Sequence, residues 1–457
     1  MAQSKILGSE KIPSLLIKQS IPAAIGILVL SIYNLVDTIF VGNYVGAMGI
    51  AAVTVTLPIS FFISSVGMAI GIGGGSVISR ALGSGNAEKA QLTFGNMIGI
   101  TLTIAAVFVI FSSIFLEEVL LTFGGKGEIM HYAMEYFQVL LIGIPFLAWA
   151  MMANNVIRAE GKPKFAMMVM MIPAVLNIIL DAVFIIYLGW GIQGAAWATT
   201  ISYLCSAIYA LGYFAYRKSE LKFERKYLRI DMNIAREIFS LGSVTLARQG
   251  TISLLILIMN HTLFSYGGEI AIAVYGIISR MIMFSLFPVM GLVQGFVPIA
   301  GYNYGAEYWD RVKDVVNKSI KYGVLLSFVI FISIIFGADA IVKVFSKNTE
   351  ILRLTPAALR IAFLATPLIA VQLIGAAYFQ AIGKPGPALI LSLSKQGFFL
   401  IPLVLILPMF FGLDGVWYSF PIADLSSTLV TWLYLKKEIN DRLNPLIHLN
   451  ELKAIRT

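Results

Sequence analysis

Long apolar segments separated by short polar ones run along almost the whole chain. A helix needs about 20 apolar residues to cross the hydrocarbon core of a bilayer. Twelve segments are long and apolar enough: 14–41, 50–79, 91–115, 131–157, 164–188, 192–216, 236–265, 269–300, 319–341, 354–382, 386–411 and 415–435. The pattern predicts an all-α polytopic membrane protein with 12 transmembrane helices.

The polar segments between these spans carry positive charge on one side only. With the N-terminus placed inside, 25 of the 33 Lys and Arg residues lie in inside segments, four lie outside and four lie within spans. Lys and Arg are enriched in cytoplasmic loops. We therefore predict a multi-pass protein of the cytoplasmic (inner) membrane with both termini in the cytoplasm.

The two halves of the chain resemble each other at a nearly constant offset. A shift of 220 residues places Gly71 on Gly291 and Gly75 on Gly295, and a shift of 222 places the tripeptide at 161–163 on the one at 383–385. Parallel repeats of this kind are a transporter architecture. We predict two pseudo-symmetric six-helix lobes that rock to give alternating access: an N-terminal lobe (1–216), a basic cytoplasmic linker (217–233), a C-terminal lobe (234–440) and a cytoplasmic tail (441–457).

Composition supports a membrane protein and disfavours other classes. Hydrophobic residues make up 58% of the chain and charged residues 12%, whereas soluble domains carry about 45–50% and about 25%. The net charge of +9 is explained by the inside loops, so we expect membrane lipids as partners and no nucleic acid. The chain has one cysteine and three widely separated histidines. With no ligand spacing and no nucleophile–base pair, we predict no cofactor and no enzymatic activity.

Two carboxylates lie within the predicted spans of the N-terminal half. Asp37 and Asp181 are in the outer parts of spans 1 and 5, where an unpaired charge is costly. Asn177 is four residues before Asp181, on the same helical face, and Thr199 and Thr200 in span 6 lie at a similar depth. Such a group can hold a proton or Na⁺. The alternative is that each acid lies near the interface and caps local polar groups.

The C-terminal half departs from this pattern. The repeat places Leu257 and Leu403 where the first half has Asp37 and Asp181. Basic residues occur within its spans, among them Arg248, Arg280 and Lys395, and Asp424 lies in the last span. They are interpreted either as a structural ion-pair network or as a wall that holds anionic or zwitterionic substrate groups.

Four stretches together resemble the multidrug and toxic compound extrusion family: "YNLVDTIFVG" in span 1, "GIGGGSVISRALGSGNAEKA" at the end of span 2, "RAEGKPK" after span 4 and "LNIILDAVFI" in span 5. The resemblance covers about residues 12–440 and is greatest to the prokaryotic branch. It implies a cation site, for H⁺ or Na⁺, at Asp37, Asn177, Asp181 and Thr199. Thr199 is preferred to Thr200 by ungapped matching from Asn177.

The resemblance implies a secondary active multidrug efflux antiporter, which exports amphipathic or cationic organic compounds in exchange for H⁺ and/or Na⁺. We expect it to act as a monomer, with a bend at Pro22 accompanying ion binding. The expected substrate contacts are Tyr136, Asn154, Arg248, Gln249 and Arg280. The alternative function is a flippase for lipid-linked oligosaccharides, which the same superfamily includes and which the basic residues of the C-terminal half leave open.

Overall fold

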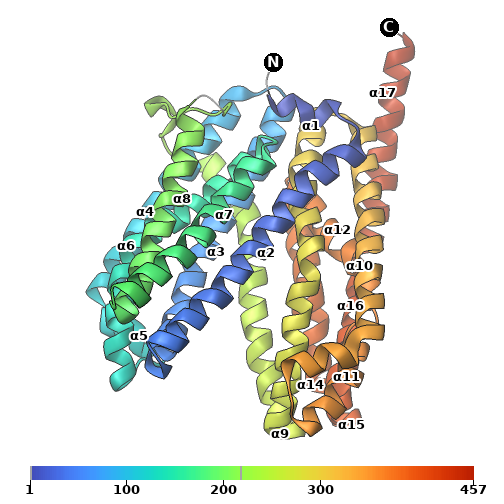
Figure 1. Cartoon of the computed structure of the whole chain (residues 1–457). Helices are drawn as coiled ribbons and strands as arrows, with labels where there is room; N and C mark the ends of the chain where they lie inside the picture. The colour runs from blue at the N-terminus through green and yellow to red at the C-terminus, as the bar shows by residue number, and fades with distance from the viewer. Residues whose placement is uncertain (1–2, 217–218, 457) are drawn as a thin grey trace. The chain divides into compact units, whose positions relative to one another are not determined.

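The computed structural model describes residues 3–216 and 219–456, and these residues form helices and loops without strands. The first half contains α1 (Ile6–Ser9), α2 (Ile12–Tyr44), α3 (Ala47–Gly83), α4 (Ala87–Ile114), α5 (Leu116–Thr122), α6 (Glu128–Ala159), α7 (Pro163–Asp181) and α8 (Gly191–Ala215). The second half contains α9 (Met232–Gly305), α10 (Trp309–Phe345), α11 (Thr349–Ala362), α12 (Ile369–Ala381), α13 (Pro385–Leu393), α14 (Ile401–Ile406), α15 (Pro408–Phe411), α16 (Leu413–Glu438) and α17 (Asn444–Arg456) (Figure 1). The predicted all-α polytopic fold is confirmed.

Ten of the helical stretches in the described residues are long and apolar enough to cross a membrane. One of them, α9, is interrupted at Gly268, whose φ of 63° and ψ of −157° lie in a region open only to glycine. This break falls between the two spans predicted at 236–265 and 269–300. The last predicted span coincides with α16, which is not among the ten.

Short π-helical and 3₁₀ segments extend or join several of these helices. The π-helical segments are η2 (Ala182–Tyr187), η5 (Ser394–Leu400) and η6 (Ile439–Leu443), and the 3₁₀ segments are η1 (Gln3–Lys5), η3 (Arg225–Tyr227) and η4 (Thr366–Leu368). The segment η2 begins directly after Asp181. Single π-turns within helices occur often at functional sites.

The chain divides into two compact units whose borders lie inside α2 and α9. The first unit comprises Met1–Leu7 and Pro22–Thr245, and the second comprises Gly8–Ile21 and Leu246–Thr457. The first ten residues of α2 therefore belong to the second unit, and the first turns of α9 belong to the first unit. The predicted boundaries of the lobes, the linker and the tail remain a prediction.

In the first unit, α3 and α8 pack on opposite parts of α6, and α7 packs on α8. Two apolar clusters hold these helices together, one around Phe94, Trp149 and Phe214, the other around Phe137 and Ile144. Glycines allow the closest approach: a Cβ on Gly73 would lie 2.4 Å from the carbonyl oxygen of Ile238. This contact fixes the start of α9 against α3.

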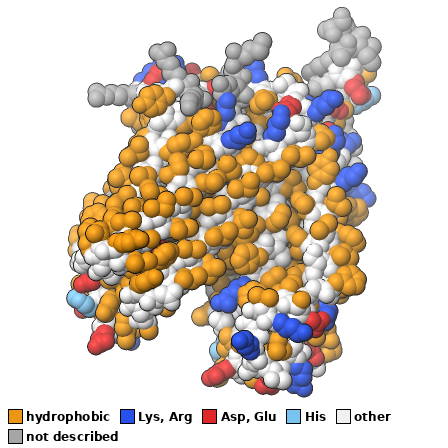
Figure 2. All heavy atoms as spheres, in the orientation of Figure 1, with side chains coloured by type: hydrophobic (Ala, Val, Ile, Leu, Met, Phe, Trp, Pro, Cys, Tyr) orange, Lys and Arg blue, Asp and Glu red, His pale blue; other side chains and the backbone are white. Residues whose placement is uncertain are grey.

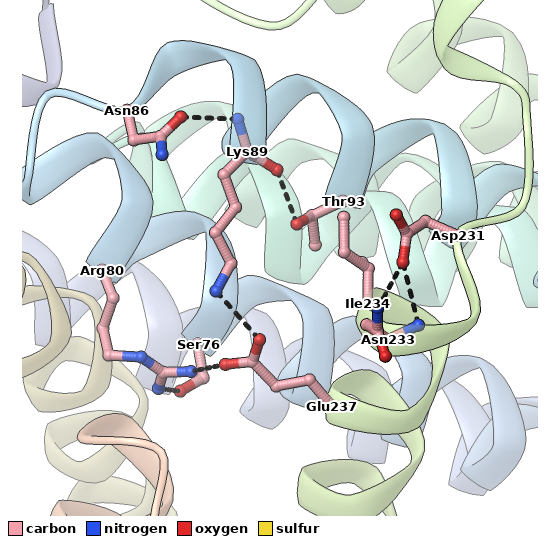
Figure 3. Close-up of polar contacts among 9 residues, drawn as sticks. All are labelled: Ser76, Arg80, Asn86, Lys89, Thr93, Asp231, Asn233, Ile234 and Glu237. Carbon is pink, nitrogen blue, oxygen red and sulfur yellow. Dashed lines mark hydrogen bonds and ion pairs between the residues drawn. The ribbon is translucent and has the colours of Figure 1, made fainter.

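Polar contacts also fix the start of α9 to the first unit (Figure 3). Glu237 forms ion pairs with Arg80 of α3 at 2.7 Å and with Lys89 of α4 at 3.0 Å. Asp231 accepts hydrogen bonds from the backbone N–H groups of Asn233 at 2.8 Å and Ile234 at 3.2 Å, which caps the helix. These contacts hold the first turns of α9 against α3 and α4.

The second unit has one large apolar cluster, which includes Tyr275, Phe363, Trp417 and Phe420. Its residues come mainly from α9, α10, α11 and α16. On the face drawn in Figure 2, hydrophobic side chains cover the middle of the helices, and Lys and Arg gather toward their ends. That distribution fits helices that contact hydrocarbon along their length.

Candidate functional site

The two predicted acids lie next to each other inside the first unit. Asp37 comes from α2 and Asp181 is the last residue of α7; 7% of Asp37 and none of Asp181 is exposed. Their side chains are close enough to interact directly. Two adjacent buried carboxylates repel each other unless a proton or another cation neutralises at least one of them. The pair is therefore arranged to hold at least one cation.

Asn177 and Thr199 complete the polar group around Asp181. In the amide orientation that satisfies both neighbours, Asn177 Nδ2 donates to Asp181 Oδ2 at 2.9 Å. Its Oδ1 then accepts from Thr199 Oγ1 at 3.1 Å and from the Thr199 backbone N–H at 3.3 Å. Both residues are buried. The four residues predicted for the cation site thus come together from α2, α7 and α8.

One oxygen of each carboxyl group has no hydrogen-bond partner among the residues that the structure describes. These atoms are Asp37 Oδ1 and Asp181 Oδ1. Buried polar atoms are almost always paired, so two such atoms in adjacent side chains indicate a binding function. Together with the side-chain oxygens of Asn177 and Thr199 they provide only oxygen ligands, which suit a proton or a hard cation such as Na⁺.

Basic side chains do not neutralise this site. The described ion pairs of the first unit lie at helix ends and loops, and none of them includes Asp37 or Asp181. Glu135, two turns into α6, pairs with the exposed His131 at 3.2 Å. The acid pair therefore lacks a protein counter-ion among the described residues, and the bound cation would supply the missing charge.

A small cavity opens beside Asp37. It has a volume of about 90 Å³ and is lined by Tyr33, Asn34, Tyr136, Thr199 and Tyr203, among others. A water needs roughly 10–15 Å³ of such space, whereas pockets for drug-sized ligands span about 300–1,000 Å³. In this structure the cavity fits an ion with a few waters and is too small for a drug.

Two tyrosines of this cavity were not predicted as site residues. Tyr33 and Tyr203 line the cavity together with Tyr136 and Thr199. Tyr33 is four residues before Asp37, and Tyr203 is four residues after Thr199. Because residues four apart share a helical face, this spacing could have identified both.

Two further residues of the first unit were predicted to take part in transport: Asn154 in substrate binding and Pro22 as a hinge. The amide of Asn154 donates to the carbonyl oxygen of Ala166 at 2.5 Å and accepts from Arg158 Nε at 3.0 Å. Pro22 lies within the continuous helix α2, at the border between the two units. Substrate binding by Asn154 and bending at Pro22 remain predictions.

In the second unit, the predicted ion-pair network comprised Arg248, Arg280, Lys395 and Asp424. The structure shows one ion pair among these four residues. Lys395 Nζ lies 2.5 Å from Asp424 Oδ1, and both side chains are largely buried. The structure gives no ion pair between this couple and Arg248 or Arg280 among the described residues. Arg248 is half-buried, whereas Gln249 and Arg280 are exposed. Substrate binding by these three residues also remains a prediction.

Comparisons with known proteins agree on one family. The MatE family profile matches residues 22–183 and 246–406. The chain is 29% identical over 405 residues to the multidrug export protein MepA of Staphylococcus haemolyticus, with 89% of each chain covered. It is 28% identical to MepA of Staphylococcus aureus strain MSSA476, with 93% of each chain covered.

Solved structures show the same fold. One, described as the crystal structure of MATE in the bent conformation, superposes with a TM-score of 0.91 at 25% identity, with 98% of this chain and 99% of that chain covered. Another, an outward-facing multidrug resistance MATE family transporter of the MOP superfamily, gives a TM-score of 0.89 at the same identity and coverage.

Proposed function

The chain belongs to the MatE family, and we propose that it is a secondary active multidrug efflux antiporter that exchanges organic compounds for H⁺ or Na⁺. Export of drugs is supported by the printed names of its relatives. The observation that carries the exchange mechanism is the buried, adjacent pair of Asp37 and Asp181, which has no basic partner among the residues that the structure describes.

The mechanism that we propose starts from the free-energy cost of burying the two negative charges of Asp37 and Asp181 next to each other. Two buried carboxylates repel each other, so their empty, doubly charged state is unfavourable. A proton or Na⁺ removes the repulsion and lets α2, α7 and α8 pack closely around Asn177 and Thr199. Loss of the cation favours a different packing of these helices. The ion can drive the change because its affinity differs between the two packings.

Binding of the drug and binding of the cation are coupled through the equilibrium between the two helix packings. If the cation weakens drug binding, the drug must weaken cation binding by the same factor. Uptake of the cation from outside therefore displaces the drug outward. Rocking of the two six-helix lobes then returns the cation-loaded transporter, which releases the cation inside. We propose amphipathic organic cations as substrates, which a low-dielectric cavity with an acidic wall would favour.

We further propose that the transporter acts as a monomer in the cytoplasmic membrane, with both termini inside. The excess of Lys and Arg in the segments on that side supports this orientation. No observation favours the flippase alternative: the relatives reported above are named multidrug exporters.

The test is drug efflux from proteoliposomes with ethidium, an amphipathic cation, as substrate. An imposed proton gradient, then an imposed sodium gradient, should drive export by the wild type in at least one case. Asp37→Asn and Asp181→Asn should each abolish export against an ethidium gradient. Asp414→Asn is the matched control, because Asp414 is exposed in the first turn of α16. Uphill export by Asp37→Asn would refute the exchange mechanism.

A further inference from the structure

A groove at the end of the first unit, formed by the linker and α4, has no role in the exchange mechanism. Its volume is about 620 Å³, and it is lined by Glu88, Leu92, Lys226, Tyr227, Arg229, Ile230, Asp231, Met232 and Asn233. This volume lies within the range of small-molecule sites, about 300–1,000 Å³. We propose that the groove binds the head group of an anionic phospholipid.

The linker is held firmly on α4, so the groove has a defined shape. Gln91 bonds both the N–H and the carbonyl group of Lys222, with its Oε1 2.9 Å from the N–H nitrogen. Asn96 donates to the carbonyl oxygen of Arg229 at 3.2 Å and accepts from the N–H of Asp231 at 2.8 Å. Both of these α4 side chains are buried.

Two further contacts tighten this attachment. A Cβ on Gly95 would come within 1.8 Å of the carbonyl oxygen of Tyr227, so only glycine permits the observed approach. Phe223 packs on Phe94 and Trp149, with ring centroids 5.6 and 6.0 Å apart. The contacts of Gln91, Gly95, Asn96 and Phe223 hold the linker at four positions. Its other side chains are therefore positioned before a ligand binds, which lowers the entropic cost of ligand binding.

Two basic side chains, Lys226 and Arg229, line the groove together with two acids, Glu88 and Asp231. Lys226 lies over the Tyr227 ring at 4.5 Å and pairs with Glu224 at 3.2 Å. The guanidinium of Arg229 has no hydrogen-bond or ion-pair partner within the described parts of the chain, so it is available to a phosphate group. Of the acids, Asp231 is occupied in capping α9 (Figure 3). Arg is the side chain best suited to bind phosphate in two-point contacts.

The position of the groove favours a lipid over a soluble phosphate compound. Leu92 lies in the second turn of α4 and Met232 begins α9, and both helices are candidate membrane spans. The groove therefore lies where a spanning helix leaves the hydrocarbon core. Ile230 and Met232 beside it are 52% and 78% exposed. Basic groups next to exposed apolar side chains at this level are typical of lipid head-group sites.

The binding test uses the whole purified chain in detergent with phosphatidylglycerol or phosphatidylcholine of the same acyl chains, followed by native mass spectrometry. The wild type should retain phosphatidylglycerol preferentially. Lys226→Gln with Arg229→Gln should weaken that retention about thirtyfold, since each basic residue near a membrane surface contributes about 1 kcal/mol. The matched control is Lys222→Gln with Arg236→Gln, which removes the same charge from exposed positions outside the groove.

Equal retention of the two lipids, or equal weakening by the control variant, would overturn the proposal. Displacement of the lipid by millimolar glycerol 1-phosphate would show that soluble phosphate compounds occupy the groove, and would also overturn it. A photoreactive phosphatidylglycerol gives a readout on the unmutated protein. It should label peptides that contain Leu92 or Met232, and labelling confined to other peptides would contradict the site.

Discussion

The two halves of the chain share a fold but differ in their buried acids. The repeat pairs Asp37 with Leu257, Glu160 with Ile382 and Asp181 with Leu403, so each of these acids of the first half corresponds to an apolar residue in the second. In the second half, the buried Asp424 is paired with Lys395 at 2.5 Å. In the described part of the first half, Asp37, Glu160 and Asp181 thus have no basic partner, whereas the buried Asp424 of the second half has one.

This difference separates two uses of a buried charge. A charge paired within the protein contributes to structure, and its removal leaves the partner stranded. A charge left without a partner is costly until a ligand compensates it. We infer that the second half supplies a stable scaffold and that the first half responds to ions. The predictions below test this contrast.

The largest expected effect is on the stability of the second half. Lys395→Met leaves Asp424 buried without a counter-ion, which should lower the free energy of unfolding by about 3–5 kcal/mol. Thermal unfolding in detergent measures it. Lys395→Met with Asp424→Leu should restore most of the loss. If the single variant unfolds like the wild type, the pair is not structural.

The second effect is a pH dependence that arises in the first half, at Glu160. This residue follows the end of α6, and its carboxylate accepts hydrogen bonds from Tyr213 at 2.9 Å, from Ser219 at 2.7 Å, and from the N–H groups of Glu220 and Leu221 at 2.7 and 3.1 Å. Burial raises the pKa of Glu160 from 4.5 to about 7, although these hydrogen bonds partly offset the shift.

The folded protein therefore holds the Glu160 proton more tightly than the unfolded chain does. Its contribution to stability is full below about pH 4.5 and is lost as the pH rises to about 7. The loss amounts to about 3 kcal/mol, at 1.36 kcal/mol per pKa unit. Melting curves between pH 5 and 8 should show it, and Glu160→Gln should flatten the dependence. An unchanged dependence in that variant would contradict the assignment.

The smallest effect distinguishes the two threonines of α8. Thr199→Val removes a hydrogen bond to Asn177 and should weaken cation binding about fivefold, because one such bond is worth about 1 kcal/mol. Thr200→Val is the control, since Thr200 donates instead to the carbonyl oxygen of Val139 at 3.1 Å. The pH or Na⁺ midpoint of ethidium transport measures both. A larger effect of Thr200→Val would reverse the preference for Thr199.

Much of the fold could be predicted from the sequence, because membrane helices need long apolar runs and the loops carry a strong charge bias. The grouping of Asp37, Asn177, Asp181 and Thr199 was predictable from helical spacing, depth and the family resemblance. Contacts between distant segments were not. Nothing in the spacing indicates that Gln91 and Asn96 hold the linker, or that Lys395 pairs with Asp424 while Arg280 does not.

The central claim is that drug and cation compete through Asp37 and Asp181. It is tested most directly by calorimetry of ethidium binding to the purified protein, in buffers that differ in ionisation enthalpy and with or without Na⁺. Reciprocal coupling predicts that the wild type releases about one cation per drug bound, and that Asp37→Asn with Asp181→Asn releases none. Equal release by the wild type and the double variant would contradict the account.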